Sequence, residues 1–223
     1  MEYGLRAIEN WDWVTLILVA MFMVLAVTRY LYPRRFMEFL YLPLSDKYFK
    51  LQGKGYEIKH PFNVLLFSIQ VLSISLFIYL LLFTFNPVNT QENPWLFVQI
   101  TTGLGLFILA KFCLEKILAH ILNIEGLIND YLYEKLSYTS IISLLILIGN
   151  ILFYFAFKPS ETVETALFVF ALVLAGLYLM SLISSFKRNR NIILRHFSYF
   201  ILYLCALEIA PYIILYYVVL KQG

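Results

Sequence analysis

Long apolar runs alternate with short polar segments along the whole chain. A helix that crosses about 30 Å of hydrocarbon needs about 20 mostly apolar residues, because its backbone N–H and C=O groups must all be satisfied within the segment. Six runs meet this requirement, at about residues 13–32, 62–85, 95–116, 136–157, 165–186 and 197–220. The pattern therefore predicts an all-α membrane protein with six transmembrane helices, which form a single polytopic membrane domain over residues 1–223.

The third run is the least uniform of the six. It is uncharged from Trp95 to Ala110 and then continues, still compatible with a helix, through Lys111 and Glu115. The i, i+4 spacing of that lysine and glutamate lets their charges meet where the helix leaves the hydrocarbon. A five-span alternative would make this segment interfacial, but it would place the two halves of the chain in conflicting charge order. Six spans are therefore expected.

Composition and charge agree with lipid as the solvent. Apolar residues make up 61% of the chain and charged residues 14%, whereas soluble domains have about 45–50% and about 25%. Fourteen of the seventeen Lys and Arg residues lie at or beyond the ends of the first, third and fifth runs, and cytoplasmic segments collect such residues. This bias predicts that both termini lie on the outer side, which also puts Trp11, Trp13 and Trp95 at the outer interface.

Two cytoplasmic segments are expected to form short interfacial helices. Residues 33–41 (PRRFMEFLY) place Phe36, Phe39 and Leu40 on one face of a helix, as in helices that lie on a membrane surface. Between the third and fourth runs, an apolar stripe leaves acidic residues facing away from it. The docking residues expected on these segments are Arg34, Arg35, Lys47, Lys50, Glu125, Asp130 and Glu134.

The acidic face has three interpretations that stay open. It is a solvated surface, a surface that packs against the basic first loop of the same chain, or a surface for a partner protein. An attraction to anionic lipid headgroups is disfavoured, because acidic helices gain nothing from them. The positive-inside rule already explains the basic loops, so no nucleic-acid partner is expected.

Glu208 is the strongest candidate for an intramembrane functional residue. It lies about eleven residues into the sixth run, and an ionised carboxylate near the bilayer centre is costly and usually marks a pathway or a buried partner. Counting depth along the helices puts Gln70, Thr102 and Asn150 near the same level. The four residues are expected to form one polar layer, which serves as hydrogen-bonding contact between helices, as a proton or ion site, or in recognition of lipid or a partner.

A second group of polar residues lies at the predicted inner edge. It consists of His60, His120, His196 and Glu115. Trusted metal sites have tight local spacing, such as two histidines on one helical face, and these histidines are dispersed. Neither a metal ion nor a cofactor is expected, and the histidines are interpreted as headgroup contacts or helix caps. No motif in the chain supports an enzymatic reaction.

The first cytoplasmic loop carries a family resemblance. The runs PRRFMEFLYLPLSDKYF and KHPFNVLLF, within residues 32–66, resemble an uncharacterised domain-of-unknown-function family. Its members are small multi-spanning inner-membrane proteins, typical of gliding, type IX-secreting Gram-negative bacteria. The resemblance implies a location in the bacterial inner membrane with periplasmic termini, and it supplies no catalytic residues.

Two functions are carried forward from the sequence. The first is a non-enzymatic scaffold or subunit of a membrane complex, whose partners are the lipid bilayer and other membrane proteins or further copies of the same chain. The second is a small carrier or a proton-coupled transport component that uses Glu208. The two differ in one respect, because only the second requires a titratable group at that depth.

Overall fold

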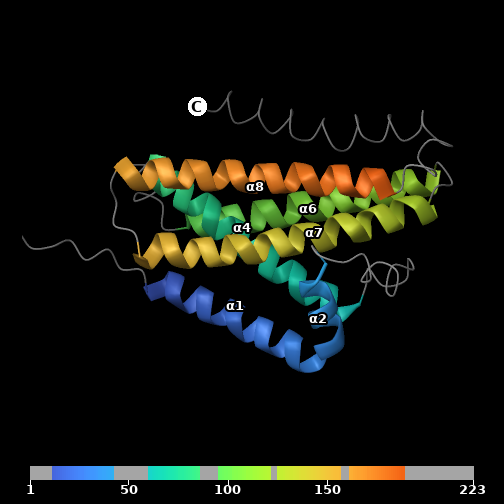
Figure 1. The fold of residues 1–223 in the computed structure, drawn as a ribbon, viewed down its shortest axis with the longest axis horizontal. Helices are drawn as coiled ribbons and strands as arrows, with labels where there is room; N and C mark the ends of the chain where they lie inside the picture. Colours follow the sequence, from blue (N-terminus) through green and yellow to red (C-terminus); the bar gives the residue numbers. More distant parts are fainter. Residues whose placement is uncertain (1–11, 43–59, 86–94, 122–124, 157–160, 189–223) are drawn as a thin grey trace, which may run out of the picture.

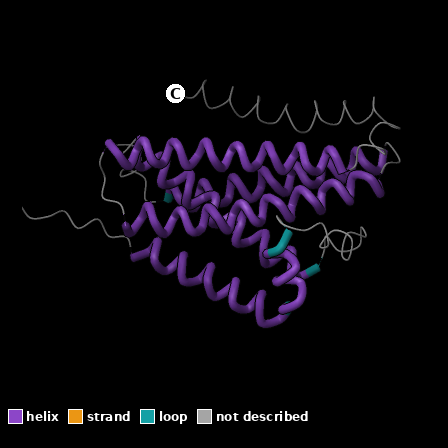
Figure 2. Tube along the Cα trace, in the orientation of Figure 1, coloured by secondary structure: helices purple, strands orange, loops and turns teal. Residues whose placement is uncertain are grey.

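The computed structural model describes residues 12–42, 60–85, 95–121, 125–156 and 161–188, and the regular structure within them is helical (Figures 1 and 2). The elements are α1 (Asp12–Leu31), α2 (Pro33–Leu40), α4 (Pro61–Phe85), α6 (Leu96–Ile121), α7 (Glu125–Ile151), η1 (Leu152–Ala156) and α8 (Glu161–Arg188). The predicted sixth span lies outside the described residues, together with Glu208, His196, Lys47 and Lys50.

Five of these helices, namely α1, α4, α6, α7 and α8, are long and apolar enough to cross a membrane. They cover the first five runs that the sequence predicted, so the prediction of an all-helical chain with several spanning helices is confirmed for the described residues. The third run belongs to α6, which continues without a break to Ile121. Because lipid supplies no hydrogen bonds, continuous helices of this kind are the expected form of the chain.

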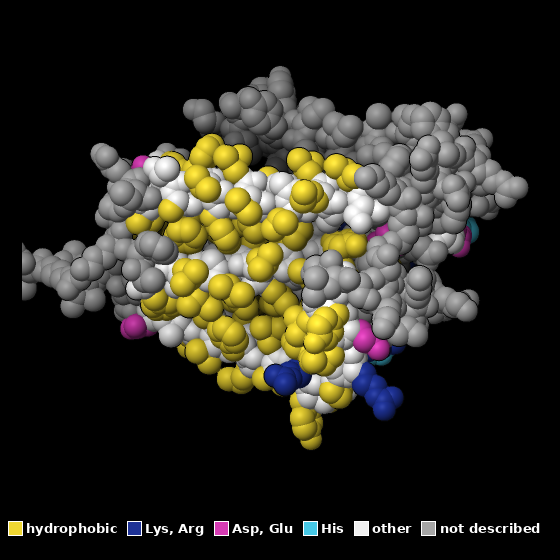
Figure 3. All heavy atoms as spheres, viewed as in Figure 1, with side chains coloured by type: hydrophobic (Ala, Val, Ile, Leu, Met, Phe, Trp, Pro, Cys, Tyr) yellow, Lys and Arg dark blue, Asp and Glu magenta, His cyan; other side chains and the backbone are white. Residues whose placement is uncertain are grey.

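Helix α4 is the centre of the bundle. It packs against α1, α6, α7 and α8, and half of its most apolar segment is buried, against 6% for α6. In Figure 1, α6, α7 and α8 run side by side along the long axis, while α1 is set at an angle to them. Apolar side chains cover much of the surface of this layer in Figure 3. The elements around α4 therefore present apolar faces outward, as lipid requires.

Helix α2 forms a tight corner between α1 and α4. Its first residue is Pro33, which suits the start of a helix because its missing N–H has no partner there in any case. Phe39 is fully buried and its ring meets Phe62 of α4 edge-on at 6.0 Å. Phe36 packs against the same cluster, but Leu40 is exposed. The amphipathic helix predicted from the sequence thus seats two of its three apolar residues against protein.

Helix α7 differs from the expectation in one respect. The sequence predicted a separate interfacial helix before a span at 136–157, whereas the structure has one helix from Glu125 to Ile151. No proline interrupts these residues, and Gly126 lies in the first turn, where it does not break the helix. Helix α7 includes the charged residues Glu134 and Lys135, whose side chains are largely buried against the rest of the bundle.

Candidate functional site

A ladder of side-chain hydrogen bonds joins α4 to α7. The Ser73 hydroxyl donates to the carbonyl oxygen of Ser143 at 2.9 Å, and the Asn150 amide donates to the carbonyl oxygen of Ser73 at 2.9 Å. Farther along, the hydroxyl of Tyr154, in the η1 segment that follows α7, donates to the carbonyl oxygen of Leu76 at 3.0 Å. Small polar side chains let two helices approach closely and hydrogen-bond where lipid offers no alternative. The two helices are held in one register by these contacts.

This ladder contains two members of the polar layer predicted from depth. Gln70 and Asn150 are both buried between α4 and α7, and the Ser140 hydroxyl donates to the side-chain oxygen (Oε1) of Gln70 at 3.3 Å. Thr102 lies instead on an exposed face of α6. Glu208 lies outside the described residues. Gln70 and Asn150 thus both lie in the α4–α7 contact, but they bond to different residues, Ser140 and Ser73.

A cavity of about 420 Å³ lies among α4, α6, α7 and α8. Most of its wall is apolar, including Phe77, Leu104, Ile108, Ile142, Ile146 and Leu174. Three charged side chains, Lys111, Glu115 and Lys135, line the same cavity. Ligand sites commonly have a volume of this size and combine an apolar lining with a few polar groups.

The three charged residues of the cavity lie at one end of it. The Lys135 ammonium group donates to Glu115 Oε1 at 3.1 Å, and these side chains are 14% and 3% exposed. Lys111 is 8% exposed and lies one helical turn before Glu115 on α6. Buried charges are tolerated only when they are paired or hydrogen-bonded. The ion pair between α6 and α7 meets that condition for Glu115 and also for Lys135, which lies beside the cavity.

Local sequence patterns could not reveal this ion pair. The sequence placed Glu115 with Lys111, four residues away, and with a dispersed group of histidines. In the structure, Glu115 accepts a hydrogen bond from Lys135, twenty residues away on the next helix. The signal that pointed in this direction was the presence of charge inside the third apolar run, because intramembrane charges require partners.

Of the histidines predicted at the inner edge, the structure describes His60 and His120, and these two occupy different settings. The His60 ring accepts a hydrogen bond from the backbone N–H of Phe62 at 3.2 Å and so caps the start of α4. His120 pairs with Glu125 at an exposed position. Within the described ranges, no group of three or more His, Cys, Asp or Glu side chains is arranged to hold a metal ion.

The predicted docking residues are found in different surroundings. Arg34 is exposed and Arg35 is half-buried on α2, and Glu125 is exposed at the start of α7. Figure 3 shows the basic side chains of this face gathered around α2. Glu134 differs from the expectation of an outward acidic face, because only 5% of it is exposed. The side chain of Asp130, like Lys47 and Lys50, lies outside the part of the molecule that is described.

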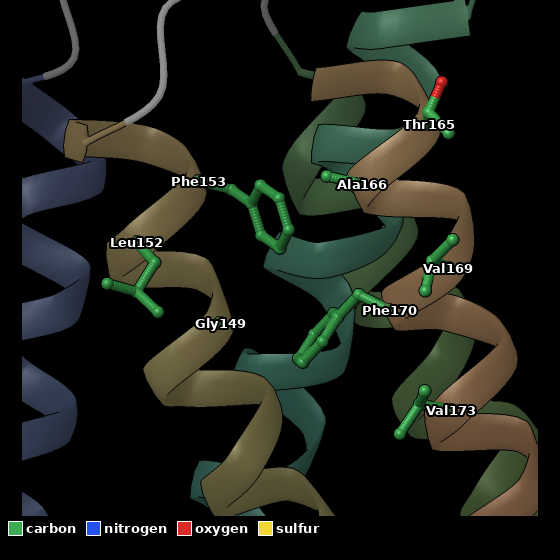
Figure 4. Close-up of a pocket in the computed structure, with 8 residues that line it drawn as sticks. All are labelled: Gly149, Leu152, Phe153, Thr165, Ala166, Val169, Phe170 and Val173. Carbon is green, nitrogen blue, oxygen red and sulfur yellow. The ribbon is translucent and has the colours of Figure 1, made fainter. Parts of the chain in front are cut away.

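A second hollow lies between α7 and α8, toward the opposite end of α7 (Figure 4). Its described wall carries no charged side chain and is apolar except for Thr165. The rings of Phe153 and Phe170 point into this region, 5.6 Å apart. Gly149 has no side chain here, and a Cβ atom on it would lie 2.5 Å from the Phe170 ring. This hollow offers packing surface but no group for chemistry.

Comparison with known proteins adds the family. No curated protein and no solved structure matches the chain. The family described as Domain of unknown function (DUF4271) matches residues 14–219, which includes nearly all the residues described above and confirms the resemblance carried by residues 32–66. The chain therefore belongs to the DUF4271 family, whose domain has no known function.

Proposed function

We propose that this protein is a non-enzymatic multi-pass membrane protein that binds a small hydrophobic or amphiphilic molecule inside its helix bundle. The cavity among α4, α6, α7 and α8 carries the proposal. Its volume of about 420 Å³ falls within the range of about 300–1,000 Å³ found for small-molecule sites. Its wall is mainly apolar, and its few polar groups converge at one end. A ligand with an apolar part for the wall and a polar part for the charged end fits this combination.

The buried charges support binding rather than simple packing. Apolar side chains of similar size would fill the space between α6 and α7 without the penalty of removing charge from water. Three ionisable groups within spanning helices, Lys111, Glu115 and Lys135, therefore need a reason to be there, and intramembrane charges commonly mark substrate or ion pathways. In the proposed function, these three groups contact the polar part of the ligand.

The proposed setting is the bacterial inner membrane, with both termini in the periplasm. Support comes from the five helices of spanning length and from the gathering of lysine and arginine residues at one side of the predicted bundle. In this orientation, the charged end of the cavity lies on the cytoplasmic side, because it is formed by the C-terminal part of α6 and the N-terminal part of α7.

A role as a scaffold or complex subunit is the competing proposal. Arg34 on α2 and Glu125 on α7 are the exposed charged residues that would dock other membrane proteins or a second copy of the chain. A proton-coupled carrier that uses Glu208 is a third, and it would draw on the same cavity only if its ligand moved across the membrane. Neither of these roles requires a molecule to occupy the cavity at rest, so occupancy separates them from the binding function.

Filling the cavity tests the proposal. Ile108 lines the cavity, whereas its neighbour Leu109 on α6 is half exposed on the outer face. The purified full chain, incubated with a panel of single-chain and two-chain amphiphiles, is examined by native mass spectrometry at an activation that strips annular lipid. We expect one retained amphiphile on the wild type and on Leu109→Trp, and at least a tenfold lower occupancy on Ile108→Trp, because the indole takes up the space.

The matched control decides how the result is interpreted. Both variants place the same indole on the same helix, one position apart, so a general effect of tryptophan on folding or detergent binding would change both. Equal retention on Ile108→Trp and Leu109→Trp would contradict a ligand in the cavity and leave the scaffold role as the stronger proposal.

A further inference from the structure

We infer that the ligand of this cavity is a single-chain amphiphile with an anionic headgroup, a carboxylate or a phosphate, which lies against Lys111 and Lys135. The inference rests on the proposed function and adds the chemical class of the ligand. It draws on the charges at one end of the cavity, the length of its apolar wall and its volume.

The charges set the sign of the headgroup. The described part of the wall brings two ammonium groups and one carboxylate to the same end, and Glu115 is hydrogen-bonded to Lys135. An anionic group placed there makes charge-assisted hydrogen bonds with lysine, and such bonds are among the strongest available to a ligand. A cationic headgroup would meet two ammonium groups against one carboxylate, at largely buried positions where charges are screened less than in bulk water.

The length of the wall sets the length of the ligand. Leu104 and Glu115 both line the cavity on α6 and are separated by eleven residues, or about 16 Å at 1.5 Å per residue. The same separation divides Lys135 from Ile146 on α7. This distance is close to half of a hydrocarbon core of about 30 Å. The ligand therefore extends from the headgroup level toward the bilayer centre, as a lipid of one leaflet does.

The polar side chains along the apolar part of the wall are turned to other uses. The Thr139 hydroxyl donates to the carbonyl oxygen of Lys135 at 2.9 Å, within its own helix. The side-chain oxygen of Gln70 accepts a hydrogen bond from the Ser140 hydroxyl at 3.3 Å across the α4–α7 contact. Because the Thr139 hydroxyl and this oxygen already have protein partners, neither requires a polar partner on the ligand. The rest of the lining in this section is mainly apolar, so an unsubstituted hydrocarbon chain suits it.

The volume favours one chain. About 420 Å³ lies in the lower part of the range for small-molecule sites, and the lining residues come from four helices. A diacyl lipid would have to leave one of its chains outside. We therefore assign the site to a fatty acid, a monoalkyl phosphate or a molecule of the same chemistry.

Binding of matched ligands to matched variants tests the inference. The ligands are hexadecanoate, hexadecyl phosphate, hexadecanol, a diacyl phosphatidylglycerol and inorganic phosphate, each titrated against the full chain in a neutral detergent and followed by native mass spectrometry. The variants are Lys111→Met, Lys111→Arg and Lys116→Met. Lys116 is the control because it lies on α6, outside the described cavity wall, with its ammonium group 5.0 Å above the Phe112 ring. Thermal midpoints establish that each variant is folded.

On the wild type, we expect the two anionic single-chain ligands to bind at least tenfold more tightly than hexadecanol. Lys111→Met should remove most of that preference, while Lys111→Arg and Lys116→Met should keep it. Equal binding of acid and alcohol to the wild type, or an unchanged preference in folded Lys111→Met, would overturn the inference. So would tighter binding of the diacyl lipid, or binding of inorganic phosphate as tight as that of hexadecyl phosphate.

The two proposals fail in different ways. If Ile108→Trp blocks all chains but the headgroup has no effect, the cavity binds a ligand and the assigned class is wrong. If Ile108→Trp blocks nothing, the cavity is not the binding site and both proposals fall.

Discussion

At the scale of single residues, depth along a helix was predictable and direction around it was not. Gln70 and Asn150 were placed near one level from the sequence, and both are buried in the α4–α7 contact, where they bond to Ser140 and to Ser73. Thr102 was placed at a similar level but lies on an exposed face of α6. A constant rise of about 1.5 Å per residue makes depth additive. The rotation of a uniformly apolar helix has no such rule, because its hydrophobic pattern marks no single inner face.

Gly149 shows a residue whose importance only the structure reveals. The Phe170 ring occupies the space where its Cβ atom would lie, and that ring is enclosed by Phe153 at 5.6 Å and by Phe77 at 5.7 Å. The sequence offered no sign of this contact, since Gly149 lies in an ordinary apolar run. The close approach of α7 and α8 at this point depends on the absence of a side chain.

Replacing Gly149 by alanine should therefore destabilise the bundle. We expect a loss of about 1 kcal/mol, because the ring has to shift from its contacts with Phe153 and Phe77, although the hollow beside it leaves room for the movement. Gly103→Ala is the control, since nothing lies within 4 Å of its added Cβ atom, and it should be neutral or stabilising by up to about 1 kcal/mol through helix propensity. Unfolding in increasing concentrations of a denaturing detergent measures the stability of both variants. Equal stability of the two variants would contradict the packing described here.

At the scale of elements, the sequence predicted which residues are helical better than how the helices associate. The first five runs correspond to α1, α4, α6, α7 and α8, because continuous apolar segments leave no other way to satisfy the backbone in lipid. The merging of the acidic segment into α7 was missed. That outcome depends on the burial of Glu134 and Lys135 against neighbouring helices, which is a tertiary property and leaves no mark in a local pattern.

The ion pair between Glu115 and Lys135 joins α6 to α7, and we expect a large coupling free energy between the two residues. Glu115→Leu or Lys135→Met alone should lower stability by about 3–5 kcal/mol, because each leaves a buried charge without its partner. The double variant should recover most of the loss. The exposed pair of His120 and Glu125 serves as the control in a second double-mutant cycle, and its coupling should be below about 1 kcal/mol.

A small coupling between Glu115 and Lys135, with losses that simply add in the double variant, would show that the two groups act independently. The contact between α6 and α7 would then depend on apolar packing alone. Reversible unfolding of the four proteins of each cycle, under one set of conditions, provides the comparison.

At the scale of the whole molecule, the arrangement of helices around a cavity was beyond the reach of the sequence. Its lining residues come from four helices, and they range from Gln70 to Tyr178 along the chain. The sequence did predict that one side of the protein is basic, and the charged end of the cavity lies on that side because α6 ends and α7 begins there. In the proposed function, the orientation in the membrane would therefore decide which leaflet faces the charged end of the cavity.

We propose that the bundle spans the inner membrane with its basic end in the cytoplasm. Single cysteines in a cysteine-free background test this orientation, one at Arg34, exposed on α2, and one at Trp95, exposed just before α6. Intact spheroplasts are treated with a membrane-impermeant maleimide. We expect rapid labelling at position 95, and labelling at position 34 only after the membrane is permeabilised. Labelling at position 34 from outside, with position 95 protected, would contradict it.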